Sequence, residues 1–194
     1  MTETEKQPHR PDYTEIIERG QRRMVLKDLE LIDKYARAIQ ARNIVEIGSM
    51  DGTSSILLGL IARDFAGRLF CIEPQPKSRW AKNMIECDLK EHVELIKACS
   101  PWVEMDKIQT PIDFLLIDGN HRTRWAIVDY HYFFPFVREG GLIAFHDYNA
   151  RKEVGKWVRR AIDIILEDDA EKIKEVGHNE TSDRGTIIFR KECP

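Results

Sequence analysis

The segment from Asn43 to Ser55, NIVEIGSMDGTSS, constrains the fold of this chain more than any other. Its mostly apolar run, residues 44–47, is typical of a buried parallel strand. Gly48 and Gly52 then bracket a tight loop, and the hydroxyl residues 53–55 can cap a following helix. In open α/β sheets this arrangement holds a nucleotide-type ligand at the carboxyl end of a strand, beside a helix N-terminus. The segment therefore predicts a ligand-binding α/β domain.

The pattern of the remaining chain extends this prediction to the whole fold. Strand-like and helix-like segments alternate after Asn43, which favours a doubly wound, mostly parallel, Rossmann-like sheet. Strands are expected at 44–47, 68–72, 93–96, 112–117, 142–145, 172–176 and 186–189. Helices are expected between them at 54–64, 77–88, 101–107, 124–137 and 153–166. Only residues 177–185 join the last two strands, so these should form a hairpin, with the final strand antiparallel to its neighbours.

Size and composition indicate one domain that acts on a small molecule. With 194 residues and 42% hydrophobic content the chain can bury one core, but it is too short for a dehydrogenase with a separate substrate domain. Residues 1–12 are predicted to be a disordered tail, and residues 13–194 a single domain. Residues 13–41 carry apolar side chains at helical spacing and should form its N-terminal helical extension. The net charge of -3 argues against nucleic-acid and membrane partners.

The sequence also predicts a cytoplasmic location. The chain starts with a polar stretch that does not resemble a secretory signal. Its longest nearly apolar run, residues 56–62, is too short to span a bilayer. The four cysteines lack any C-x-x-C pairing, which fits a reducing compartment.

The charges around the glycine loop favour a cationic ligand. Glu46 and Asp51 flank the glycines in an E-x-G-x-x-x-G spacing, whereas a dinucleotide pyrophosphate prefers G-x-G-x-x-G without fixed negative charge. A ligand that carries an ammonium and a sulfonium fits better. Glu73 follows the next strand about 20 residues later, where an acid meets ribose hydroxyls in nucleotide-binding sheets.

Two later segments place acids and imidazoles at strand ends. IDFLLIDGNH ends its strand with Asp118 and His121, and GGLIAFHDY ends the next with His146 and Asp147. Together with the glycine loop and Glu73, these motifs resemble the class I S-adenosylmethionine (SAM)-dependent methyltransferases. They are most similar to a branch of small-molecule O-methyltransferases that carries IDGxH and GGLIAFHDY. The resemblance covers most of the chain from residue 43 onward and implies a seven-stranded sheet with one reversed strand.

The resemblance and the residue chemistry together suggest roles for individual side chains. SAM is the expected cofactor, and its predicted binding residues are Glu46, Gly48, Ser49, Gly52, Ser54, Glu73, Cys99, Ser100 and Asp118. His121 is the expected general base, because imidazole titrates near neutrality and the catalytic partner Asp118 would orient it and raise its pKa. Ser100 has a second interpretation, as a helix N-cap before Pro101.

A divalent metal, Mg or Mn, is also considered, with Asp118, His146 and Asp147 as its ligands. Metal-dependent relatives use an acid-acid-amide set. Here the two acids match, but Tyr148 stands where the amide would be, which leaves Asn149 or His146 as the replacement. In the alternative interpretation these side chains bind no metal and only orient one another or cap loops.

These observations predict a SAM-dependent methyltransferase that acts on a hydroxyl oxygen of a small-molecule acceptor. Three alternatives stay open: a nicotinamide- or flavin-dependent oxidoreductase, a module that binds SAM without catalysis, and a metal-dependent hydrolase. The acidic loop and the short chain argue against the first, and the hydrolase leaves Glu46 and Glu73 without a role. The amphipathic N-terminus and the aromatic residues between 125 and 136 leave a homodimer open.

Overall fold

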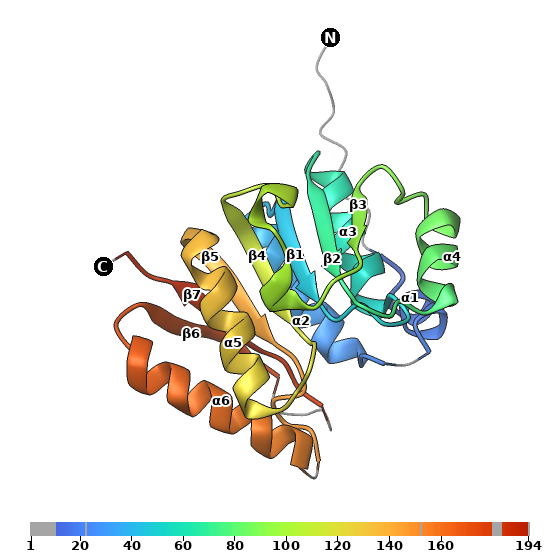
Figure 1. The fold of residues 1–194 in the computed structure, drawn as a ribbon. Coiled ribbons are helices and arrows are strands. Elements are labelled where there is room, and N and C mark those ends of the chain that lie inside the picture. Colours follow the sequence, from blue (N-terminus) through green and yellow to red (C-terminus); the bar gives the residue numbers. More distant parts are fainter. Residues whose placement is uncertain (1–10, 22, 152, 180–183, 194) are drawn as a thin grey trace.

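Seven strands form one sheet within the residues that the computed structural model describes, 11–21, 23–151, 153–179 and 184–193. The strand order is β3-β2-β1-β4-β5-β7-β6 (Figure 1). The strands are β1 (Asn43–Ile47), β2 (Arg68–Ile72), β3 (Val93–Ile96), β4 (Ile112–Ile117), β5 (Val137–Phe145), β6 (Ile173–His178) and β7 (Ile187–Lys191). Every predicted strand is present, and the predicted fold class is confirmed.

The direction of strand addition reverses at β1. This strand pairs in parallel with β2 on one side and β4 on the other, so that Val45 lies opposite both Phe70 and Leu115. β3 extends the sheet beyond β2, and β5 extends it beyond β4. At such a reversal the loops after neighbouring strands turn to opposite faces and leave a crevice for a ligand. The topology therefore places a ligand site at the ends of β1 and β4.

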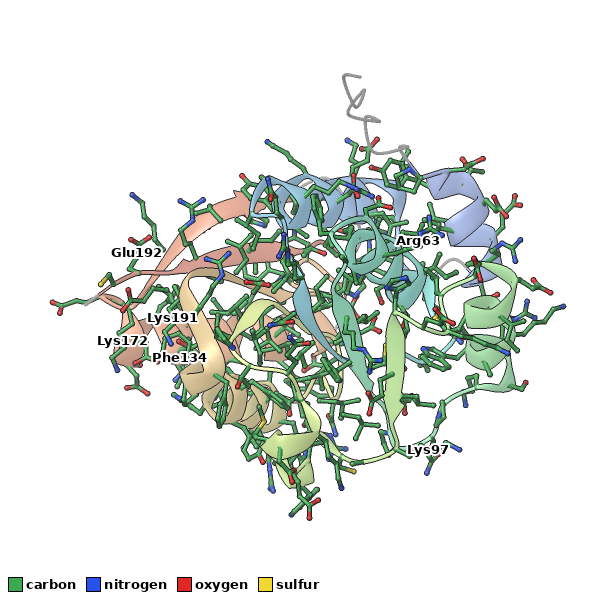
Figure 2. All side chains as sticks on the ribbon, turned by 90° about the horizontal axis from the view of Figure 1, so that it is seen from above. Arg63, Lys97, Phe134, Lys172, Lys191 and Glu192 are labelled. Carbon is green, nitrogen blue, oxygen red and sulfur yellow. The ribbon has the colours of Figure 1, made fainter. Side chains whose placement is uncertain are left out.

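The C-terminal hairpin forms as predicted, with β7 antiparallel to both β5 and β6. Lys191, at the end of β7, donates from Nζ to the carbonyl oxygens of Phe134 (3.0 Å) and Val137 (2.7 Å). The same ammonium lies 4.4 Å from the centre of the Phe134 ring. Figure 2 labels Lys191 and Phe134, which lie close together near the C-terminal strands. These contacts fix the last strand against the turn that precedes β5.

Helices cover both faces of the sheet and create two apolar cores (Figures 1 and 2). One core involves α1 (Tyr13–Arg19), α2 (Leu26–Ala38), α3 (Thr53–Asp64) and α4 (Ser78–Glu86). The other involves α5 (Thr123–Phe133) and α6 (Glu153–Asp169). Leu29, Ile32 and Ala36 of α2 are fully buried, so the N-terminal helices are part of the core. None of the helices described is both long and apolar enough to cross a membrane.

The helix expected at residues 101–107 is wrong. Two 3₁₀ turns take its place, η1 (Ser100–Trp102) and η2 (Met105–Lys107). Val103 and Glu104 adopt extended backbone angles between the two turns, which prevents a continuous helix.

The boundary between α5 and β5 also differs from the prediction. The helix ends at Phe133 rather than Val137, and a 3₁₀ turn, η3 (Phe134–Phe136), follows it. Pro135 has no N–H with which to continue the helix. β5 then begins at Val137, which pairs with Ile112 of β4, so the strand is longer than expected.

The predicted disordered tail, residues 1–12, lies outside the described residues except for Pro11 and Asp12. Asp12 caps α1, because its Oδ1 accepts hydrogen bonds from the backbone N–H groups of Thr14 (2.9 Å) and Glu15 (3.2 Å).

Candidate functional site

A cavity of about 690 Å³ opens at the carboxyl ends of the central strands, where the strand order predicts a crevice. It gathers most of the predicted site residues, namely Gly48, Ser49, Ser54, Glu73, Cys99, Ser100, Asp118, His121, His146 and Asp147. Two predicted cofactor-binding residues, Glu46 and Gly52, do not line it. Its volume is within the range of about 300–1,000 Å³ that is usual for small-molecule sites.

The glycine loop allows β1 and β4 to end close together. Gly48 has φ +90°, and a Cβ added there would lie only 2.3 Å from the carbonyl oxygen of Asp118. Gly52 has φ +91° and precedes the first residue of α3. Both positions therefore need glycine for the backbone alone, since an L side chain is strained at such φ values.

Glu46 holds α3 onto β1 from behind the loop. Its carboxylate is fully buried and accepts hydrogen bonds from the hydroxyls of Ser54 and Ser55 and from Cys71 Sγ at 3.1 Å. Trp80 Nε1 donates to Ser55 Oγ at 3.1 Å. Burial raises the pKa of Glu46 to about 7, and its hydrogen bonds only partly oppose this. These side-chain contacts make Glu46 a support of the loop.

Glu73 presents an oriented carboxylate to the cavity. Its Oε1 accepts from the backbone N–H of Gln75 at 2.9 Å, and its Oε2 accepts from that of Met50 at 3.3 Å. Each carboxylate oxygen has a second lone pair, so two backbone bonds fix the group and leave acceptor capacity for a ligand. Glu73 is therefore a fixed hydrogen-bond acceptor at the cavity wall.

Asp118, His121 and Asp147 form a compact cluster on the opposite side of the cavity. His121 Nε2 lies 3.3 Å from Asp118 Oδ1 and 2.8 Å from Asp147 Oδ2. Burial lowers the pKa of His121, but the two carboxylates outweigh burial and raise it to about 9. One ligand atom from each of the three residues lies within 4.8 Å of the others, so the cluster is also a candidate metal site.

His146 is more buried than the predicted metal set assumes. Its Nδ1 lies 3.0 Å from Asp118 Oδ1, and its Nε2 lies 3.6 Å from Oδ2 of Asp28, a fully buried acid of α2. Burial lowers the pKa of His146, but Asp118 and Asp28 outweigh it and raise the value to about 10. Burial raises the pKa of Asp118, but His146 and His121 outweigh it and hold that pKa below its usual range. The three-residue cluster thus contains His121 where the prediction had His146.

The amide that could complete a metal set lies elsewhere. Asn149 Nδ2 donates to the carbonyl oxygen of Asn179 at 2.9 Å, and the ring of Tyr148 packs edge-on against His178. Neither Asn149 nor Tyr148 lines the cavity. His121 and His146 therefore both lie beside the two acids, and His121 is the more exposed of these imidazoles.

Two buried acids that contact the site were missed by sequence reasoning. Asp28 accepts a hydrogen bond from Asn179 Nδ2 at 2.8 Å in addition to its contact with His146. Asp129 of α5 accepts a hydrogen bond from Ser100 Oγ, and burial raises the pKa of Asp129 to about 6. Each acid lies on the apolar face of its helix, and that unusual position is the sequence signal that could have identified it.

Comparison with known families agrees with this geometry. Residues 45–148, more than half of the chain, match the model of a family described as a methyltransferase domain. The chain belongs to this methyltransferase family. The matched region contains the glycine loop, Glu73 and every residue of the acid and imidazole cluster.

Individual relatives of this methyltransferase-family protein are distant. It is 31% identical over 116 residues to the uncharacterized protein R132 of Acanthamoeba polyphaga mimivirus, a match that covers 54% of this chain and 50% of the viral protein. The chain thus spans about half the length of this curated relative.

Solved structures share the fold over almost the whole chain. One is the O-methyltransferase TomG of Streptomyces achromogenes, involved in tomaymycin synthesis and crystallised with SAM (TM-score 0.75, 16% identity, 95% of this chain and 92% of TomG). Another is an O-methyltransferase of Bacillus cereus in complex with SAH (TM-score 0.71, 17% identity, 92% and 90% covered). At such low identity these likenesses establish the fold alone.

Proposed function

We propose that this protein is a SAM-dependent methyltransferase that transfers a methyl group to a hydroxyl oxygen of a small molecule. One observation carries the proposal: a single cavity joins the oriented carboxylate of Glu73 to the Asp118, His121 and Asp147 cluster. The relatives named above, which include O-methyltransferases crystallised with SAM or SAH, support the same assignment. The absence of nucleic-acid and membrane partners, the cytoplasmic location and the homodimer remain predictions from the sequence.

The lining of the cavity suits SAM. Five carboxylates line it, those of Asp51, Glu73, Asp118, Asp129 and Asp147, against five basic groups, Arg23, Lys77, Arg184, His121 and His146. The lining thus has no excess of positive charge to attract a pyrophosphate, and its carboxylates can stabilise an ammonium and a sulfonium. When bound, SAM supplies an electrophilic methyl group. Glu73 would accept the hydrogen bonds of the ribose hydroxyls, and the glycine loop would pass beside the ligand without a side chain in the way.

The protein's own contribution to chemistry is to orient the acceptor hydroxyl and remove its proton. His121 would take that proton on Nε2, next to Asp118 and Asp147, which stabilise the imidazolium that forms. A pKa of about 9 lies close to that of a phenol, about 10. His121 is therefore matched to phenol and enol hydroxyls better than to sugar hydroxyls, whose protons are less acidic.

A divalent metal is the competing means of activation in the same cluster. Asp118, Asp147 and a neutral His121 would be its ligands, and their oxygen and nitrogen atoms suit Mg or Mn. The ion would lower the pKa of a hydroxyl that it binds. His121 would then be a ligand rather than a base, and the reaction would require the metal.

Calorimetric titration tests the cofactor and the metal together. We expect SAM and SAH to bind with micromolar affinity, NAD not to bind, and Glu73→Ala to lose most of the affinity for both sulfur ligands. The titrations are repeated with Mg, with Mn and after EDTA treatment. Binding of NAD without binding of SAM or SAH would overturn the proposal in favour of an oxidoreductase.

Turnover distinguishes an enzyme from a module that only binds SAM. Radiolabelled SAM is incubated with a panel of phenols and enols, and methyl transfer is measured for the wild type and for His121→Gln. An enzyme loses turnover in the variant while it retains SAM affinity. SAM binding without transfer to any member of a broad panel would favour the binding module.

A further inference from the structure

If Glu73 binds the ribose of SAM, as proposed above, the base of the ligand lies toward β3. The reacting methyl group must reach the cluster of Asp118, His121 and Asp147, at the ends of β4 and β5. In SAM the base is attached to C1′ and the sulfonium to C5′, on opposite sides of the sugar ring oxygen. Because β2 lies between β3 and β1 in the sheet, a sulfonium directed toward β4 leaves the base directed toward β3.

The β3 side of the cavity has the surfaces that a purine needs. Trp102 and Trp125 both line the cavity, with their ring centres 6.2 Å apart. Trp102 is 68% exposed, so a large aromatic surface there has no protein cover among the described residues. A flat heteroaromatic ring packs favourably on such side chains. Cys99 and Ser100, which follow β3, line the same region.

Asp129 supplies a polar group at this end. Only 2% of the surface of Asp129 is exposed, yet the residue lines the cavity. Its Oδ1 accepts the hydrogen bond from Ser100 Oγ, whereas Oδ2 has no donor within hydrogen-bond distance among the described residues. A Cβ added to Gly119 would lie 3.5 Å from Oδ2, so the lack of a side chain at this cavity-lining glycine leaves the oxygen accessible.

We propose that Asp129 Oδ2 accepts a hydrogen bond from the exocyclic amino group of the adenine and selects for this base. This oxygen is open to the cavity, so a ligand N–H can reach it and form a hydrogen bond to a charged acceptor. The amino group is the donor that distinguishes adenine from a 6-oxopurine. Ser100 is a positioning residue, because its hydroxyl fixes the other carboxylate oxygen and thereby the direction of Oδ2.

Binding of two product analogues tests this specificity. Calorimetry compares SAH with S-inosylhomocysteine, in which a carbonyl oxygen replaces the amino group. The wild type should prefer SAH by about 10- to 100-fold, the effect of one hydrogen bond to a charged group. In Asp129→Asn the side-chain amide can donate to the carbonyl oxygen, so the preference should fall to about threefold or less, or reverse. Asp129→Ala should abolish the preference without reversing it.

The outcomes separate this role from a structural one. Equal affinity of the wild type for the two ligands, within about threefold, would overturn the role of Asp129 while leaving the proposed function intact. The role of Asp129 is also overturned if Asp129→Asn and Asp129→Ala lower the affinity for SAH and for S-inosylhomocysteine equally. A carboxylate that only anchors η1 would not distinguish the two bases. If SAH does not bind the wild type, the proposed function fails and this inference fails with it. Thermal unfolding of each variant controls for its fold, and the wild-type ratio is decisive even if a variant does not fold.

Discussion

At the scale of single residues, the charges of the cavity meet at Asp118. One oxygen of its carboxylate lies within 3.3 Å of His121 and within 3.0 Å of His146, which come from two different loops. Both imidazoles line the cavity, but His146 is almost fully buried and also faces Asp28, whereas His121 is more exposed and lies closer to Asp147. The buried imidazole of His146 therefore balances the charge of Asp118, and the more exposed imidazole of His121 is the one that can act as a base.

This arrangement predicts the pH dependence of catalysis. An imidazolium cannot accept a proton, so the rate without added metal should rise with pH until His121, with a pKa of about 9, is neutral. His121→Gln should lower kcat by about 10²-fold or more and abolish this rise, because general base catalysis contributes about 10²–10⁴. The measurement is kcat against pH from 6 to 10, with the exposed His131→Gln as the matched control. A rate that is independent of His121, or that requires Mg or Mn and titrates lower, would support the metal instead.

Glu46 predicts a pH dependence of stability with a definite sign. Its folded pKa of about 7 is above the ordinary value of 4.5, so the folded state favours the protonated form. This contribution to the free energy of unfolding is fully present below pH 4.5 and is lost as pH rises through 7. Raising the pH from 5 to 8 should therefore destabilise the wild type more than Glu46→Gln, which stays neutral.

Urea unfolding at both pH values measures this difference. The exposed variant Glu91→Gln should retain the pH dependence of the wild type. If Glu46→Gln has the same pH dependence as the wild type, the buried carboxyl is already ionised at pH 5 and the assignment is wrong.

At the scale of elements, the sequence was sufficient wherever a signal is local. The strand and glycine loop at 43–52 and the C-terminal hairpin follow from apolar runs, turn residues and connection length, and the structure contains them. The errors lie where a helical pattern continues across a backbone obstacle. Pro135 ends α5 early, and the extended Val103 and Glu104 divide the expected helix after β3.

The site follows the same rule. Acids and imidazoles at the ends of β4 and β5 could be brought together from sequence, because parallel strands end at the same edge of the sheet. The partners Asp28 and Asp129 could not, because their roles depend on which helix packs beside which strand. The orientation of His146 toward Asp28 depends on the same tertiary contact, so the choice between His121 and His146 was beyond local signals.

The element α2 yields a test of whether the N-terminal helices are core or lid. Ile32 is fully buried in the first core, whereas Leu26 on the same helix is 44% exposed. Ile32→Ala should lower the free energy of unfolding by about 2–5 kcal/mol. The matched control Leu26→Ala should change it by about 0.5 kcal/mol or less. Chemical denaturation measures both, and a loss for Ile32→Ala as small as that of the control would indicate a mobile lid.

At the scale of the whole molecule, the cavity is closed by segments from both ends of the chain. Arg23 and Met24, which precede α2, line it together with Arg184, which precedes β7. The guanidinium of Arg184 donates to the carbonyl oxygen of Arg23, and Arg23 Nε lies 3.2 Å from Asp51 Oδ2 of the glycine loop. A ligand in the cavity therefore contacts elements that are distant in sequence, and its binding is linked to the stability of the entire fold.

This linkage predicts a thermal shift that is specific to the sulfur ligands. A ligand at 100 times its dissociation constant stabilises the folded state by about 2.7 kcal/mol. In a domain of this size that raises Tm by about 5–11 °C. SAH should produce this shift, NAD at the same concentration should not, and Glu73→Ala should lose most of it because the ribose hydroxyls lose their acceptor.

Because the loops after β1, β2, β4 and β5 share the cavity, the shift should appear as one cooperative transition by both circular dichroism and tryptophan fluorescence. A shift seen by fluorescence alone would mean that the ligand contacts only Trp102 and Trp125, and a full shift in Glu73→Ala would show that Glu73 does not bind the ribose.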